Sequence, residues 1–385
     1  MAKQNKPAIR FKGFTDAWEQ RKAKELCNIG TGKSNTQDQV EDGIYPFYIR
    51  SDIPVKSNKY LYDCEAVITI GDGNIGRVFH YVNGKFDLHQ RCYKMTDFQD
   101  IWGKYFYYFF STRFYDRAMK MTAKATVDSV RLEMISEMDI WKPTAIDEQK
   151  KIAEFFANLD HLITLHQRKY DKLQVLKKAM LEKMFPKNGS SVPEIRFKGF
   201  TDAWEQRKVG EVSESYSGGT PSVGVKEYYG GQIPFIRSAE INSEITELFL
   251  TEEGLKNSSA QLVAVGDILY ALYGATSGEV GRARLKGAIN QAILAIKPHT
   301  DYDSEYLAQW LRKSKHSIIE TYLQGGQGNL SGTIVKELSV DFPSLKEQKA
   351  IGGFFRQLDN LITLHQRELE KLQNIKKSML EKMFV

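Results

Sequence analysis

One long helical segment occurs twice in this chain of 385 residues and limits what the chain can fold into. The segment spans 148–185 and returns at 347–384, with 26 of 38 aligned positions identical. Apolar residues recur in both copies at steps of three, four or seven, the pattern of an amphipathic helix. At 1.5 Å per residue each copy is a rod of about 57 Å, and such a rod needs an apolar partner along its length. The sequence therefore predicts that the two copies pack against each other.

A shorter box is duplicated as well. Residues 7–22 recur at 193–208 with a single difference in sixteen positions. Each repeat opens with this box, passes through a variable segment and closes with the long helix, and the run 186–194 links the two repeats. Because two copies are too few for a solenoid, we expect a pseudo-twofold arrangement of two different variable segments on equivalent scaffolds. The expected apolar anchors of the first box are Ile9, Phe11, Phe14 and Trp18.

The variable segments share an outline of strands and helices. Tyr45–Ser51 and Ile233–Ser238 are rich in aromatic and β-branched residues and end in Arg-Ser, which predicts two short strands. The ranges 66–81 and 267–285 each predict a buried strand, a glycine-rich turn and a second strand. Aromatic-rich helices follow in both segments. The predicted fold class is α+β, with each variable segment a mixture of helices and strands.

Both long helices are preceded by a proline and by residues with capping-box spacing. Ser344 and Glu347 stand three residues apart before the second helix, and Thr144 and Asp147 do so before the first. In a capping box the hydroxyl accepts a hydrogen bond from an amide of the first turn, and the carboxylate accepts one from the cap amide. We therefore expect the two helices to begin in the same way.

Composition excludes several classes of protein. With 42% hydrophobic and 12% aromatic residues, the chain has enough apolar surface to build real cores. No apolar run reaches the roughly 20 residues of a membrane span, and the N-terminal residues lack the apolar centre of a signal peptide, so we expect a cytoplasmic location. The three cysteines lie in the first half without paired spacing, which argues against a disulfide framework and against a thiolate metal site.

No catalytic motif emerges from the residues. Gly71, Gly73 and Gly76 have G-x-G-x-x-G spacing, but a dinucleotide loop needs a helix start directly afterwards, whereas the residues that follow continue a strand pattern. We interpret the glycines as a tight turn between strands. The chain also lacks a P-loop, a nucleophile elbow, a zinc-protease motif and an Asn/Asp-Pro-Pro-Tyr methyltransferase motif. The sequence therefore predicts no enzyme activity and no metal site.

The net charge of +6 is not by itself evidence for nucleic-acid binding by the variable segments, because it is unevenly distributed along the chain. The positive excess lies in the repeated segments, while the two variable segments are neutral to acidic overall. Their turns are nevertheless rich in Arg, Lys, Asn, Gln and Ser, whose side chains match the hydrogen-bonding groups of base edges. From composition alone these are also ordinary surface residues, so both interpretations stay open at this point.

The whole organisation resembles the specificity subunit of type I restriction-modification systems. The resemblance rests on two variable segments, each opened by an RFKGFTDAWEQRK box and closed by the LITLHQR-containing helix. It implies two target recognition domains at 1–147 and 195–346, the second box beginning at 193. It further implies that the helices 148–185 and 347–385 form an antiparallel coiled coil that separates the domains, with 186–194 as linker.

The resemblance also implies a function and partners. The chain would be a non-catalytic subunit that reads a bipartite target in double-stranded DNA and directs two methyltransferase subunits and the restriction subunits to it. S-adenosylmethionine, ATP and Mg²⁺ would belong to those partners, with no cofactor in this chain. The alternative is a structural adaptor, or an orphan or inhibitory subunit, that binds the methyltransferase without productive DNA recognition.

We expect DNA contacts at corresponding turns of the two variable segments, where arginine recognises guanine and asparagine or glutamine recognises adenine. The candidates in the first segment are Arg50, Ser51, Lys56, Asn74, Arg77, His89, Gln90 and Arg91. The candidates in the second segment are Ser217, Thr220, Arg237, Ser238, Thr276, Arg282, Asn290, Gln291, Gln324 and Asn329.

Overall fold

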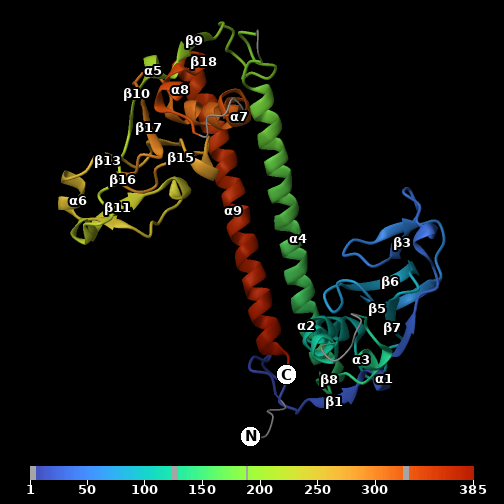
Figure 1. The fold of residues 1–385 in the computed structure, drawn as a ribbon. Coiled ribbons are helices and arrows are strands. Elements are labelled where there is room, and N and C mark those ends of the chain that lie inside the picture. The colour runs from blue at the N-terminus through green and yellow to red at the C-terminus, as the bar shows by residue number, and fades with distance from the viewer. Residues whose placement is uncertain (1–5, 123–128, 188–189, 324–328) are drawn as a thin grey trace. The chain divides into compact units, whose positions relative to one another are not determined.

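The chain forms two compact units. The structure is a computed structural model that describes residues 6–122, 129–187, 190–323 and 329–385. Unit 1 comprises Met1–Gln167 and Gln366–Val385, and unit 2 comprises Arg168–His365. Each unit contains helices and strands (Figure 1), so the predicted α+β class is confirmed.

A six-stranded sheet forms the centre of unit 1. Its strand order is β2-β7-β5-β6-β3-β4, in which β3 runs parallel to β6 and the other neighbours are antiparallel. The second half of β5 is fully buried, because it is a run of apolar and β-branched residues with no polar face. The strands are β2 (Asn28–Thr31), β3 (Tyr45–Tyr48), β4 (Val55–Ser57), β5 (Tyr62–Ile70), β6 (Phe79–Leu88) and β7 (Cys92–Thr96).

Helix α2 (Gly103–Thr122) lies between this sheet and the long helix α4 (Ile146–Lys183), as Figure 1 shows. Its Phe110 meets Phe79 of β6 with ring centroids 5.7 Å apart, and its Tyr108 meets Phe156 of α4 at 5.3 Å. The aromatic run that predicted this helix therefore fills the core on two sides. The short elements of the unit are β1 (Glu19–Lys22), α1 (Ala23–Leu26), η1 (Thr36–Asp38), α3 (Leu132–Ser136) and β8 (Asp139–Lys142), with β1 and β8 paired antiparallel.

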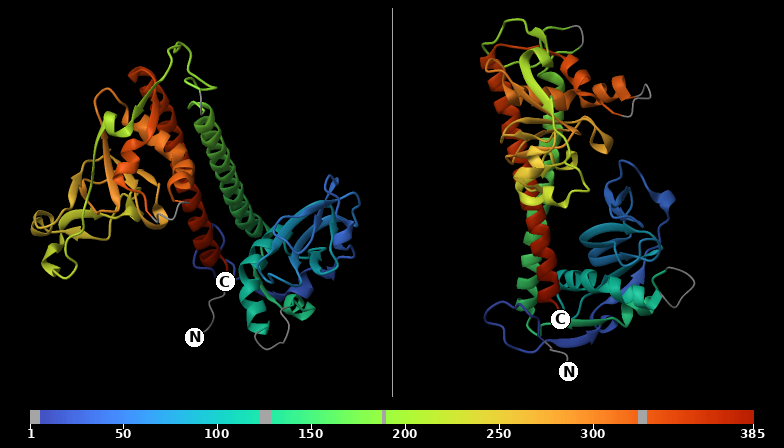
Figure 2. Two further views of the ribbon diagram at one scale, coloured as in Figure 1. Left: turned by 45° about the horizontal axis from the view of Figure 1, so that its top comes forward. Right: turned by 60° about the vertical axis from the view of Figure 1, so that its left-hand side comes forward.

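In unit 2 the strands are divided between two four-stranded sheets. Figure 2 shows two further views of the ribbon. One sheet has the order β10-β17-β14-β15 and the other β12-β11-β16-β13. The strands are β10 (Ser213–Ser217), β11 (Tyr229–Ile236), β12 (Phe249–Leu250), β13 (Gln261–Val263), β14 (Ile268–Ala271), β15 (Val280–Arg282), β16 (Gly287–Ile289) and β17 (Ile293–Pro298). The remaining strands, β9 (Glu205–Lys208) and β18 (Ser339–Phe342), form an antiparallel pair. The helices are α5 (Val209–Val212), α6 (Glu252–Lys256), α7 (Ser304–Leu323) and α8 (Gly332–Glu337).

The long helices α4 and α9 (Leu345–Met383) each contribute one end to each unit. In unit 1 the start of α4 packs on the end of α9, where Asp160 pairs with Lys376 at 2.5 Å. In unit 2 the end of α4 packs on the start of α9, where Lys177 pairs with Asp359 at 2.5 Å. Because start meets end in both units, the helices are antiparallel, and the predicted pairing of the two copies is confirmed.

The duplicated boxes attach to the long helices through a buried ion pair that the sequence did not reveal. Arg10 donates two hydrogen bonds to Glu148, at 2.6 and 2.7 Å, and Arg196 donates two to Glu347, at 2.7 and 2.8 Å. Both carboxylates are 1% exposed. Paired guanidinium and carboxylate planes fit this two-bond geometry, so the box is held at the first turn of each helix.

This ion pair corrects the predicted capping boxes. Ser344 does accept a hydrogen bond from the Glu347 amide, at 3.4 Å, but the Glu347 carboxylate binds Arg196 instead of the cap amide. In unit 1 the buried acid is Glu148, whereas Thr144 and Asp147 are exposed. A guanidinium competes well for a buried carboxylate because it supplies charge as well as two donors.

The box anchors are partly as predicted. Trp18 is buried, and the ring of Phe11 meets Phe155 in an edge contact at 6.0 Å. Phe14 is half-buried under the ammonium group of Lys151. Ile9 was predicted as an anchor, but its side chain is exposed, and its backbone amide donates a hydrogen bond to the carbonyl of Lys382 at 3.0 Å.

Candidate nucleic-acid interface

Two candidate arginines of unit 1 meet at one carboxylate. Arg50 follows β3 and Arg91 precedes β7, and both donate to Asp72, which follows β5, at 3.3 and 2.7 Å. Burial disfavours the charged form of Asp72, but the hydrogen bonds from the arginines outweigh it and hold the pKa of Asp72 below its ordinary value. The shared carboxylate fixes two exposed guanidinium groups side by side at one end of the sheet.

His89 and Gln90 lie in the turn before Arg91, but only one of them is accessible. The ring of His89 is 4% exposed, and its Nδ1 accepts a hydrogen bond from the backbone amide of Arg91 at 3.1 Å. Burial, together with the charges of Arg50 and Arg91, lowers the pKa of His89. This histidine supports the turn from inside. Gln90 is exposed, and its amide group donates to Asn35 at 2.6 Å.

Unit 2 also holds a glutamine at the equivalent turn, but there the glutamine accepts the hydrogen bond instead of donating it. Gln291 precedes β17 as Gln90 precedes β7, and it accepts a hydrogen bond from Thr220 at 2.6 Å. Both glutamines are therefore oriented by a polar residue that follows the first strand of the sheet. Asn290 is half-buried and accepts a hydrogen bond from the backbone amide of Ala292 at 3.2 Å.

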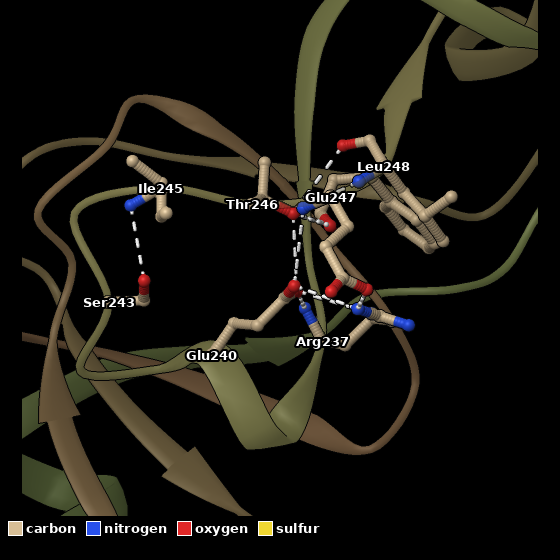
Figure 3. Close-up of polar contacts among 8 residues, drawn as sticks. Arg237, Glu240, Ser243, Ile245, Thr246, Glu247 and Leu248 are labelled. Atoms are coloured by element: carbon tan, nitrogen blue, oxygen red, sulfur yellow. Dashed lines mark hydrogen bonds and ion pairs between the residues drawn. The ribbon is translucent and has the colours of Figure 1, made fainter. Parts of the chain in front are cut away.

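Arg237 occupies the place of Arg50 in the second unit but has different partners (Figure 3). Its guanidinium donates to Glu240 at 2.8 and 3.2 Å and to Glu247 at 2.7 Å. Burial alone would raise the pKa of Glu240, yet the hydrogen bonds from Arg237 and from the Glu247 amide hold it at about 2. Thr246 also donates to Glu240, at 3.1 Å. The arginine is thus built into a closed network at the end of β11.

The other candidates do not join these groups. Arg77 lies over the ring of Tyr115 in α2, at 4.5 Å, and Arg282 donates to Glu305 in α7 at 3.1 Å. Ser51 and Thr276 use their hydroxyl groups within their own turns. The remaining candidates are half-buried or exposed: Lys56, Asn74, Ser217, Ser238 and Asn329. Gln324 lies outside the described residues.

Several residues of the two turns escaped prediction. Asp72 pairs with both arginines of unit 1 but was not among the predicted candidates. Asn35 and the glutamates Glu240 and Glu247 act in the same supporting way. The available signal was the proximity of polar residues to strand ends, but their partners come from distant turns. Only Glu240 lies within three residues of the arginine that it binds.

The described part of the chain shows neither a metal centre nor a membrane span. Among those residues, no three or more His, Cys, Asp or Glu side chains gather as a group able to hold a metal ion. None of the described helices is both long and apolar enough to cross a membrane. Strand β6 follows the glycines at 71, 73 and 76, so the predicted turn between strands is confirmed and the dinucleotide loop is excluded.

The chain thus combines a duplicated α+β fold with polar turns at matching strand ends. Sequence comparison identifies the family to which this arrangement belongs. The family profile for the type I restriction modification DNA specificity domain matches residues 15–175 and 201–374. The chain therefore belongs to this family. Its members are specificity subunits without catalytic activity of their own, and this chain is a non-catalytic protein of DNA sequence recognition.

Two relatives come from Methanocaldococcus jannaschii. The type I restriction enzyme MjaIX specificity subunit is 30% identical over 190 residues, which are 47% of this chain and 44% of that protein. The MjaVIII specificity subunit is 24% identical over 370 residues, or 89% of this chain and 86% of the relative. The first match thus spans less than half of its relative, whereas the second spans most of it.

The fold is also similar to a solved structure. The crystal structure of the type I restriction-modification system S subunit from M. genitalium matches with a TM-score of 0.76 over 99% of both chains, at 15% sequence identity. Because the sequence identity is low, this similarity shows the fold alone. The match covers both units and the two long helices, so the predicted fold class of mixed α and β domains with two long helices is confirmed.

Proposed function

We propose that this chain reads a bipartite target in double-stranded DNA and directs two methyltransferase subunits and the restriction subunits to it. The observation that carries the proposal is the repeated turn, in which Gln90 and Gln291 are held at the same place in two otherwise different units. A glutamine whose amide is oriented in advance loses less side-chain entropy on hydrogen bonding to a base. Since each unit has one such turn, each unit would read one half-site.

The proposed target recognition domains are residues 1–147 and 195–346. The long helices would set the distance between the half-sites, because a helix of 38 residues extends about 57 Å, or about 17 base pairs at 3.4 Å each. Both helices pass from one unit into the other. Helix length, and not base chemistry, would then determine the number of unread base pairs between the half-sites.

The proposed partners carry the chemistry. Methyltransferase subunits would supply S-adenosylmethionine, and restriction subunits would supply ATP and Mg²⁺, with assembly in the cytoplasm. Exposed apolar side chains on the long helices, Leu162 and Leu165 in unit 1 and Leu361 and Leu364 in unit 2, support a docking role for these faces. The four leucines occupy equivalent positions in the two copies, as two identical partner subunits would require.

Methylome sequencing tests the proposal directly. The chain is expressed with its methyltransferase partner in a host that lacks adenine methylation, and methylated adenines are mapped. We expect one motif with two short specified halves and a fixed unread spacer. Methylation without such a motif, or methyltransferase binding without methylation, would favour the adaptor or inhibitory alternative. Methylation by the purified chain with S-adenosylmethionine alone would contradict the assignment as a non-catalytic subunit.

A further inference from the structure

A strongly basic cavity lies in unit 2, away from the turns described above. It has a volume of about 440 Å³ and is formed by β15, α7, the end of α4 and the start of α9. Five cationic side chains line it: Lys177, Arg282, Arg284, Arg312 and Arg356. Arg284 and Arg356 are exposed, so the cavity is open to solvent on the side where these two arginines lie.

The carboxylates that line the cavity are already occupied. Glu305 accepts from Arg282 at 3.1 Å and pairs with Arg312 at 3.5 Å. Asp359 pairs with Lys177, and it also lies 3.5 Å from Arg312. Glu279, the third lining acid, pairs with Lys315. Arg284, which also lines the cavity, pairs with Glu244 outside the lining at 2.5 Å. Among the described residues Arg356 pairs with no carboxylate, so it is the lining cation that remains available to an anion.

Arg282 shows the effect of the neighbouring cations. Its Nε is buried and has no hydrogen-bond partner among the described residues. Burial lowers the pKa of Arg282, and the neighbouring charges of Arg312 and Arg356 lower it further against the opposing effect of Glu305. A guanidinium stays charged in proteins, so crowding of this kind costs free energy until an anion offsets it.

Unit 1 shows that the scaffold does not require these arginines. The equivalent helices align through Tyr105 and Tyr306, each of which donates its hydroxyl to the backbone of the strand before the long helix. In that alignment Ser111 stands at the position of Arg312. In the repeated long helix Ala157 stands at the position of Arg356. The two arginines are therefore additions to unit 2, made at sites where the same fold uses small residues.

We propose that this cavity binds a phosphate group of the DNA backbone beside the second half-site. Arginines match a phosphate because their fork of donors contacts two of its oxygens at once. The assignment rests on the proposed function, since it presumes that unit 2 binds DNA. Contacts of this kind position a protein on the duplex and carry no sequence information.

The test uses the complex of this chain with its methyltransferase partner and measures binding to target and non-target duplexes over a range of salt. Arg356→Ala should weaken binding to target and non-target duplexes alike by about tenfold. It should also make the slope of the logarithm of the binding constant against the logarithm of the salt concentration shallower by about 0.9. The matched control is Lys349→Ala, which removes one exposed charge from the same helix outside the cavity. Equal slopes for the two variants would overturn the proposal.

A second measurement locates the phosphate. Single phosphates of the target are replaced one at a time by neutral methylphosphonates. At one position beside the second half-site, the replacement should lower the affinity of the wild-type complex about tenfold. The same replacement should not lower the affinity of the Arg356→Ala complex any further. If inorganic phosphate or ATP raises the melting temperature of the wild-type chain but not of Arg356→Ala, and no methylphosphonate matters, the cavity takes a free anion and the DNA assignment is wrong.

These outcomes separate the inference from the proposed function. If the wild type binds its target sequence-specifically and Arg356→Ala binds with the same affinity and salt slope, only the phosphate site is overturned. Absence of sequence-specific binding by the wild type would contradict the proposed function itself. Arg356→Lys retains the charge without the fork of donors, and it should recover the salt slope but only part of the affinity.

Discussion

Arg237 and Arg50 end equivalent Arg-Ser strands, yet their guanidinium groups are held by different carboxylates. Arg50 shares Asp72 with Arg91, whereas Arg237 binds both Glu240 and Glu247. The arginines were predictable from the repeated pattern of residues. Their partners were not, because Asp72 is 22 residues from Arg50 and comes beside it only through the sheet. For Arg237 to read a base, the exposed carboxylate of Glu247 would have to release it.

Replacing Arg237 should change one half-site only. Arg237→Ala is expected to relax the preference at one base of the second half-site by about 1–3 kcal/mol, because a bidentate contact to guanine is lost there. Methylome sequencing measures the effect. Arg207→Ala, an exposed arginine on β9, is the control and should leave the motif unchanged. Loss of preference in both half-sites would contradict independent reading by the two units.

Glu240 should make unit 2 sensitive to acid. Its folded pKa of about 2 lies below the ordinary value, so its contribution to stability is present above about pH 4.5 and is lost as the pH falls toward 2. Glu240→Gln should lower the free energy of unfolding at pH 7 by on the order of 1 kcal/mol and flatten its dependence on pH in that window. Denaturant titrations across the window measure this, and an unchanged dependence on pH in Glu240→Gln would contradict it.

The element that joins each box to its helix is a buried ion pair. The repeats predicted that box and helix belong together, and apolar anchoring was the expected reason. Trp18 and Phe11 do pack, but Arg10 and Glu148 provide the directional contact, and Arg196 and Glu347 repeat it. Hydropathy patterns do not reveal such pairs, because an arginine in a polar box resembles any surface arginine until its partner is known.

Removing one partner of this pair should be costly. Glu148→Gln leaves the Arg10 guanidinium largely buried without its counter-charge, and we expect unit 1 to lose about 3 kcal/mol of stability. Glu347→Gln should do the same to unit 2. Asp147→Asn, at the exposed neighbouring position, is the control and should change stability by less than about 0.5 kcal/mol. Equal effects of Glu148→Gln and Asp147→Asn would show that the pair is not what holds the box.

At the scale of the whole molecule, both long helices pass from one compact unit into the other, and antiparallel packing occurs in each unit through reciprocal pairs. Asp160 with Lys376 and Lys177 with Asp359 are the same contact made twice, once in each unit. The pairing was predictable because two identical apolar faces have each other as natural partners. Their antiparallel direction was implied only by the family resemblance, and the two reciprocal ion pairs show it in the structure.

Shortening both helices should shorten the DNA spacer. Deleting seven aligned residues from each, 168–174 and 367–373, keeps the apolar register and removes about 10 Å, or about three base pairs. Methylome sequencing would show the same two half-sites with a shorter gap. Deleting the seven residues from one helix only should break the reciprocal ion pairs and abolish methylation. An unchanged spacer after the double deletion would disprove the role of the helices in spacing.

The sequence by itself determined the architecture of this protein, because repeats and helical periodicity can be recognised directly in the order of the residues. It established two units, mixed α and β structure, and long helices that pair with each other. The tertiary structure decided which polar residues meet: the arginines around Asp72, the glutamates around Arg237 and the arginines of the basic cavity. These contacts join residues from separate turns and helices, and their proximity depends on how the strands and helices fold together.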